Sequence, residues 1–134
     1  MPTAFKASLI TPEAIVLETQ ITAAQVPVFD GQVGILDHRA PLLAKMGTGL
    51  LRLDTAEGPQ RFLVSGGYAQ MKGDELTILT TEAVPAGQIT GEMIGKEESK
   101  LNAIVGDDKK SMEARQGIQL RISAMRSAQG AGGR

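Results

Sequence analysis

The sequence contains no cysteine and no tryptophan, and it has only one tyrosine and three phenylalanines. The absence of cysteine excludes disulfides, thiolate metal sites and thiol nucleophiles. The scarcity of aromatic residues argues against the stacking platforms on which proteins bind single-stranded nucleic acid. The formal net charge is −1, so no overall field attracts the chain to nucleic acid or to an anionic membrane.

Long apolar runs are also absent, since none approaches the ~20 residues of a membrane-spanning helix. Residues 1–6 lack the basic segment and apolar run of a secretory signal. We therefore expect no direct membrane insertion, and any membrane association would pass through a partner protein. The 134 residues suffice for one domain, or for one domain with an appendage.

The first two thirds of the chain alternate short apolar segments with turn signals. Strands are predicted over residues 4–10, 14–18, 20–29, 33–36, 50–54, 60–65, 68–71 and 76–81. The apolar residues of 20–29 do not keep one parity, which predicts a bulge near Ala24 and Gln25. A series of about eight to ten short strands with regular turns is typical of an antiparallel sandwich or barrel.

The apolar period changes from two toward 3.6 after Pro85. A first helix is predicted over roughly residues 90–105 and a second over 108–128, joined by a turn at Gly106. The apolar stripes are Ile94, Leu101 and Val105 with Met93 and Ile104, and then Ala114, Ile118, Ile122 and Met125. The predicted organisation is a β-sandwich domain over 1–86, an αα hairpin over 87–128 and a disordered end over 129–134.

The predicted hairpin has little intrinsic stability. Gly91, Gly95 and Gly117 each cost ~1 kcal/mol relative to alanine inside a helix. Both apolar stripes are narrow, so the helices must pack on each other or on another surface.

Residue patterns that suggest chemistry have simpler explanations. Asp37 and His38 are neighbours, which places them on opposite faces of a strand and disfavours an acid–base pair. The glycines of residues 31–34 lack the Lys-Ser/Thr ending and the following helix of a phosphate loop. Asp107, Asp108 and Glu113 match no calcium-loop spacing and suit the first turn of a helix. No catalytic residue, cofactor or metal site is predicted.

The predicted second helix is basic. Its arginines Arg115, Arg121 and Arg126 form either a solvated helix face or a docking surface for an acidic partner, which would be regulatory.

The stretch from residue 26 to residue 43 is the most specific part of the chain. It contains Val26 and Pro27, a Gly-x-x-Gly-Ile strand at 31–35, the step Ala40-Pro41-Leu42-Leu43, and a glycine at 47 or 49 before the next strand. Ser65-Gly66-Gly67-Tyr68, Leu76-Thr77-Ile78-Leu79 and Thr81-Glu82-Ala83 follow in order. In sequence and spacing these motifs resemble the ε subunit of F-type ATP synthases, the counterpart of the mitochondrial δ subunit.

The resemblance implies a ten-stranded antiparallel β sandwich with a C-terminal helical hairpin, and a place in the central rotor stalk. It implies binding to the γ subunit and the c-ring, and coupling of proton flow to ATP synthesis without catalysis. The hairpin of such subunits can dock on γ or rise toward the α/β head and block ATP hydrolysis. The location would be peripheral, on the cytoplasmic face of a bacterial inner membrane.

By position, the resemblance assigns Phe29, Asp30, Gly31 and Gln32 to the turn that faces the c-ring. It assigns Arg39, Ala40, Pro41, Leu42 and Leu43 to the edge near γ. Two departures matter: Arg39 replaces the usual histidine, with His38 one residue earlier, and residues 88–94 lack the Asp-x-x-Arg-Ala pattern implicated in ATP binding. ATP binding is therefore not predicted.

Two alternatives belong to other classes of protein. A free-standing β-sandwich adaptor with a helical appendage would bind another protein through the same edge. An enzyme would need a pocket with convergent ionisable groups around His38.

Overall fold

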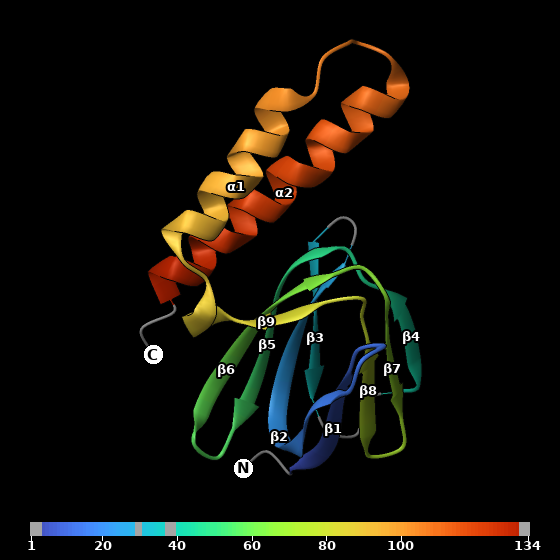
Figure 1. Ribbon diagram of the computed structural model, residues 1–134. Coiled ribbons are helices and arrows are strands. Elements are labelled where there is room, and N and C mark those ends of the chain that lie inside the picture. The colour runs from blue at the N-terminus through green and yellow to red at the C-terminus, as the bar shows by residue number, and fades with distance from the viewer. Residues whose placement is uncertain (1–3, 29–30, 37–39, 132–134) are drawn as a thin grey trace.

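The computed structural model describes residues 4–28, 31–36 and 40–131. Within these ranges the chain forms a sheet system of nine strands followed by helices (Figure 1). The strands are β1 Phe5–Ile10, β2 Ile15–Val28, β3 Gly31–Leu36, β4 Leu42–Lys45, β5 Thr48–Thr55, β6 Gly58–Ser65, β7 Tyr68–Lys72, β8 Glu75–Leu79 and β9 Ala83–Pro85. The helices are the short 3-10 helix η1 Ala86–Gln88, α1 Gly91–Ala103 and α2 Lys109–Ala131.

The long strand β2 joins the two layers of the sandwich. Its first half pairs with β1, and its second half pairs with β3 and β5. One layer is therefore β4-β7-β8-β1 with the start of β2, and the other is β3, the end of β2, β5, β6 and β9. Leu9, Ile78, Leu51 and Val64 come from both layers and are fully buried in one core. The predicted N-terminal β sandwich is confirmed.

Three details of the strands differ from the prediction. Residues 14–18 and 20–29 were predicted as two strands, but β2 is continuous because no glycine or proline interrupts it around Thr19. The shift in register lies between Ile21 and Ala23 in the pairing with β5, and not at Ala24 and Gln25. β1 and β8 are parallel, although an antiparallel sandwich was predicted. These strands are distant in sequence, and local turn signals carry no information about such a pair.

The helical hairpin is confirmed, with changes at its ends. The side-chain oxygen of Thr90 accepts a hydrogen bond of 3.2 Å from the N–H of Met93, which caps α1. α1 ends at Ala103, so Val105 lies outside the helix and is 83% exposed. The prediction that Val105 belongs to the apolar stripe of the first helix is therefore wrong. Asp108 accepts from the N–H of Ser111 at 3.3 Å and caps α2. The hydroxyl of Ser111 also donates a hydrogen bond to the Asp108 carboxylate. This bond, together with the one from the N–H of Ser111, holds the pKa of Asp108 below its usual range.

The end of α2 also differs from the prediction. Residues 129–131 are helical, so the predicted disordered end at 129–134 begins too early, and residues 132–134 lie outside the described residues. Ala128 is completely buried in the apolar cluster beneath the helix, which explains why the last turns stay helical.

The hairpin packs on the outer face of the second layer. α2 contacts β5 and β6, whereas α1 packs on α2, and the tip of the hairpin projects beyond the sandwich (Figure 1). A second apolar cluster joins them through residues such as Leu63 of β6, Ile94 of α1 and Met125 of α2. Of the predicted stripe on the second helix, Ile122 and Met125 are buried, but Ala114 is exposed.

We expect Gly67→Ala to destabilise the sandwich by more than about 2 kcal/mol. Gly67 has a φ of +101°, and a Cβ there would lie 1.9 Å from the carbonyl oxygen of Leu79. Urea unfolding followed by circular dichroism would measure the change. Gly34→Ala is the matched control, because its Cβ meets no atom within 4 Å, and it should stay within about 0.5 kcal/mol of the unsubstituted protein. Equal stability of the two variants would contradict the prediction.

Candidate interaction surfaces

The outer face of the β4-β7-β8-β1 layer carries exposed apolar side chains. Ile10 pairs with Leu79, and Leu79 pairs in turn with Tyr68, so these side chains share one face of the sheet. Leu43 of β4 lies on the same face, because it stands two residues before Lys45, which pairs with Tyr68. The exposed fractions of Leu43, Tyr68 and Leu79 are 68%, 50% and 49%. Half-exposed apolar residues gathered on one face are typical of a protein–protein contact.

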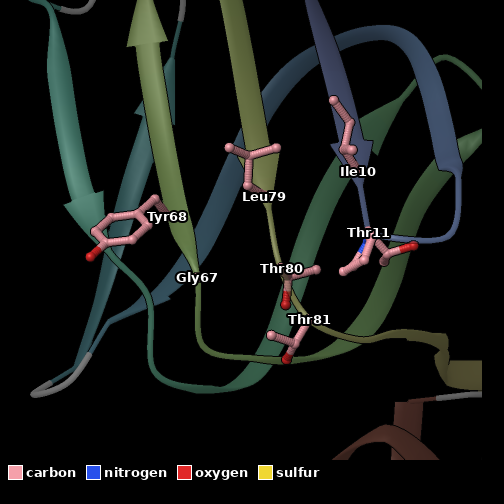
Figure 2. A pocket seen from close by; sticks show the side chains of 8 residues that line it. Ile10, Thr11, Gly67, Tyr68, Leu79, Thr80 and Thr81 are labelled. Carbon is pink, nitrogen blue, oxygen red and sulfur yellow. The ribbon is translucent and has the colours of Figure 1, made fainter.

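This apolar face contains a hollow of about 350 Å³, which lies at the end of β1 and β8 (Figure 2). Ile10, Leu79 and Tyr68 project from neighbouring strands, and Thr80 and Thr81 continue along the chain below them. Gly67 and Pro12 also line it. Methyl groups, aliphatic side chains and hydroxyls offer a surface on which an apolar side chain of a partner can pack.

Four of the residues assigned by sequence to the γ edge lie at the start of β4 or just before it. Ala40 and Pro41 are exposed, Leu42 packs against the sandwich core, and Leu43 points outward. Arg39 lies outside the described residues, as do Asp37 and His38. Leu43 thus connects this edge with the apolar face.

Two of the residues assigned to the c-ring turn begin β3. Gly31 and Gln32 are exposed, whereas Phe29 and Asp30 lie outside the described residues. A hollow of about 490 Å³ extends from Gly31 and Gln32 to Leu120 on α2. Gly31 and Gln32 therefore lie close to α2.

Arg121 on α2 is the centre of a polar network between the hairpin and the sandwich. Its side chain is 22% exposed. One terminal nitrogen donates to the hydroxyl of Ser65 at 2.9 Å and also to a carboxylate oxygen of Glu82. The second terminal nitrogen donates to the other carboxylate oxygen of Glu82 at 3.0 Å. Its Nε donates to Glu97 of α1 at 3.1 Å. The hydrogen bond to Glu82 is the main cause that raises the pKa of Arg121, against the opposing effect of burial.

The other predicted docking arginines lie elsewhere on α2. Arg126 forms an ion pair with Glu98 of α1, and Arg115 is partly exposed near the projecting half of the hairpin. The three arginines therefore do not form one surface, since Arg121 is mostly buried and Arg126 is paired within the hairpin.

The sequence interpretation missed Glu82, Glu97 and the apolar sheet face. A signal for Glu97 was present, because Glu97 lies at helical spacing between Ile94 and Leu101, on the apolar stripe of α1. Arg121 interrupts the stripe of α2 in the same way, next to Ile118 and Ile122. Opposite charges on two facing apolar stripes predict an ion pair between the helices.

Among the described helices, none combines the length and hydropathy needed to cross a membrane. No group of three or more histidine, aspartate or glutamate side chains in the described ranges is arranged to hold a metal ion.

Comparisons with known proteins identify relatives of the whole architecture. The family described as "ATP synthase, Delta/Epsilon chain, beta-sandwich domain" matches residues 4–86. The ATP synthase epsilon chain of Rhodopirellula baltica is 33% identical over 122 residues, which cover 91% of each chain. The chloroplastic epsilon chain of Cyanidioschyzon merolae is 36% identical over 95 residues, covering 71% of this chain and 72% of the relative.

Solved structures share the fold. A chain of the Euglena gracilis mitochondrial ATP synthase, in its assembly of OSCP, F1 and c-ring, superposes with a TM-score of 0.83 at 20% identity. It covers 96% of this chain and 82% of that chain. A chain of the Tetrahymena thermophila mitochondrial ATP synthase, from its central stalk and c-ring, superposes with a TM-score of 0.73 at 13% identity. The match covers 95% of this chain and 97% of that chain.

We expect Gly117→Ala to stabilise the hairpin by about 0.5–1 kcal/mol, because a Cβ at Gly117 meets no atom within 4 Å and alanine favours the helix. Hydrogen exchange of the α2 amides would report the change as slower exchange. Gly106→Ala is the opposite control, since Gly106 has a φ of +106° and its Cβ would lie 3.1 Å from the Asp108 carboxylate. Faster exchange in Gly117→Ala would contradict the expectation.

Proposed function

The chain belongs to the ATP synthase delta/epsilon chain family, and we propose that it is a non-catalytic rotor subunit of the central stalk. In this role it links the γ subunit to the c-ring and couples proton transport to ATP synthesis. The family match over the whole sandwich is the observation that carries the proposal. We propose a peripheral location on the cytoplasmic face of a bacterial inner membrane, where its partners hold it.

A linking subunit needs two contact surfaces, and β3 connects the segments that the sequence assigns to them. Gly31 and Gln32 begin this strand, and the segment that leads to Leu43 follows its end. The turn of Phe29, Asp30, Gly31 and Gln32 is the proposed contact with polar loops of the c-ring.

The proposed γ surface begins at the edge formed by Arg39, Ala40, Pro41, Leu42 and Leu43 and extends over the apolar sheet face. Leu43, Tyr68 and Leu79 supply the apolar centre, and the hollow beside Ile10 can accept a side chain of γ. Packing of apolar and hydroxyl groups gives adhesion without acid–base chemistry, which agrees with a role in transmitting torque.

The proposed regulatory role belongs to the hairpin. Arg115, Arg121 and Arg126 are the residues through which α2 would dock on the α/β head, and because they do not form one surface they would reach acidic groups at separate points. Arg121 is engaged with Glu82 and Glu97 while the hairpin lies on the sandwich. Docking on the head through Arg121 therefore requires the hairpin to leave the sandwich first.

We expect the double variant Leu43→Glu and Leu79→Glu to weaken capture of γ by roughly tenfold or more, because it buries charge at the centre of the proposed contact. Binding of purified γ to the immobilised full-length chain would measure this. Leu36→Glu is the control: Leu36 is 57% exposed on β3 of the other layer, and capture should be unchanged. A chain that stays monomeric and indifferent to γ would favour the free-standing adaptor instead.

We expect a chain shortened after Ala86 to remain bound to γ and the c-ring and to increase ATP hydrolysis by the assembled enzyme. The sandwich core contains no residue of the helices, so it should fold without them. ATPase assays of complexes with the full and shortened chains provide the measurement. Unchanged hydrolysis by a complex that retains the shortened chain would assign inhibition to another factor.

A further inference from the structure

The outer face of the second layer carries two arginines beside the area that the hairpin covers. On β5 and β6, Leu50 pairs with Leu63, and both lie under the helices. The next pair on the same face is Arg52 opposite Arg61, because side chains two residues apart along a strand point the same way. Both arginines are partly exposed. The sheet therefore presents two neighbouring guanidinium groups next to an apolar patch.

The charges of this arginine pair are only partly balanced. Like charges directly opposite each other on neighbouring strands destabilise a sheet. One carboxylate oxygen of Asp54 lies 3.2 Å from the Nε of Arg52, but this buried Nε has no hydrogen-bond partner among the described residues. Arg61 belongs to none of the ion pairs found within the described ranges. The group therefore keeps an excess of positive charge, which an incoming carboxylate would neutralise.

A hollow of about 300 Å³ opens on the same face, between Arg52 and the end of β3. Gln25 pairs with both Arg52 and Gly34, so its side-chain amide lies next to the guanidinium. Leu36 lies at the other end, where it pairs with Ala23, and it is 57% exposed. A Cβ at Gly34 would meet no atom within 4 Å, so the space between the two ends is open. No described residue of α1 or α2 except none from the lining set covers it, since the lining comes from the strands.

The two ends of the hollow suit the two ends of one kind of ligand. The guanidinium of Arg52 and the amide of Gln25 are hydrogen-bond donors, and a carboxylate accepts from such groups in a forked geometry. Leu36 and Ala23 offer hydrocarbon, on which an aliphatic chain can pack. β5 and β3 are two strand spacings apart, about 10 Å, which a chain of about six carbons can bridge between side chains. Inorganic phosphate would use the arginine but leave the apolar end empty.

We propose that this hollow binds an aliphatic carboxylate, with the carboxylate on Arg52 and Gln25 and the hydrocarbon chain on Leu36. Arg61 does not line the hollow and supports binding through its charge. A free aliphatic acid and a glutamate side chain of a partner protein present this same chemistry. The site belongs to the second layer, whereas the proposed γ face belongs to the first, so the proposal does not depend on the proposed function.

The test is a titration of the isotope-labelled full-length chain with hexanoate, followed by nuclear magnetic resonance. Hexanoate should shift the backbone amide of Gly34 and the side-chain N–H signals of Gln25 and Arg52 along one saturable curve. Acetate should bind about threefold or more weakly, because it lacks the hydrocarbon chain. Hexanol, which lacks the charge, should give no saturable shift.

Two variants test the two ends of the site. Arg52→Gln should weaken hexanoate binding by roughly tenfold or more, the effect of losing a charged hydrogen bond. Lys72→Gln is the matched control with the same change of charge, since Lys72 is exposed on β7 of the other layer, and it should bind hexanoate like the unsubstituted chain. Leu36→Ala should bind hexanoate and acetate with nearly equal affinity. Circular dichroism verifies that each variant is folded.

Three results would overturn the proposal. Shifts that do not saturate, or equal binding by Arg52→Gln, would show a general ionic effect. Equal affinities of the unsubstituted chain for hexanoate and acetate would show that the apolar end is not used. A capped peptide, acetyl-Leu-Glu-Leu-amide, then identifies the source of the carboxylate. Tighter binding of the peptide than of hexanoate at the same signals assigns the site to a partner's glutamate, and weaker binding assigns it to a free aliphatic acid.

Discussion

The structure depends on a sheet that is apolar on both faces. In β6 the side chains of Phe62 and Val64 enter the sandwich core, whereas Leu63 between them points outward and is completely buried by the hairpin. β5 has the same character, with Leu51 inside and Leu50 packed under the helices. Because both faces are apolar, removing each of them from water is favourable, and a cover on each side lowers the free energy of the folded chain. The first strand layer provides one cover and α2 provides the other.

This constraint also orders the hairpin. The glycines of α1 and α2 disfavour isolated helices, and each stripe alone buries little. Contact with Leu63 and Leu50 supplies the missing apolar area to the C-terminal half of α2. The projecting half lacks such support, which agrees with the exposure of Val105 and Met112 near its tip. The stability of the hairpin is therefore concentrated at its end nearest the sandwich.

The local features of the fold were predictable because their physical causes are local. The turns, the change of apolar period after Pro85 and the cap at Asp108 follow from neighbouring residues. The parallel pairing of β1 with β8 could not be read in this way, because it depends on which distant strands meet. The exposed face of Tyr68 and Leu79 was missed for the same reason, since register decides which side chains share a face. Of the assigned contact residues, Phe29, Asp30 and Arg39 lie outside the described residues, and the partner assignments rest on family resemblance.

The two apolar clusters have no buried residue in common, and this separation has a mechanical consequence. The sandwich core contains no residue of the helices, so departure of the hairpin would leave its packing intact. The same departure would expose Leu63, Leu50 and Val84 to water. An exposed patch of this kind favours return of the helices or contact with another protein. The apolar surface under α2 thus biases the hairpin toward the sandwich, while the polar contacts of Arg121 fix the orientation in which it lies there.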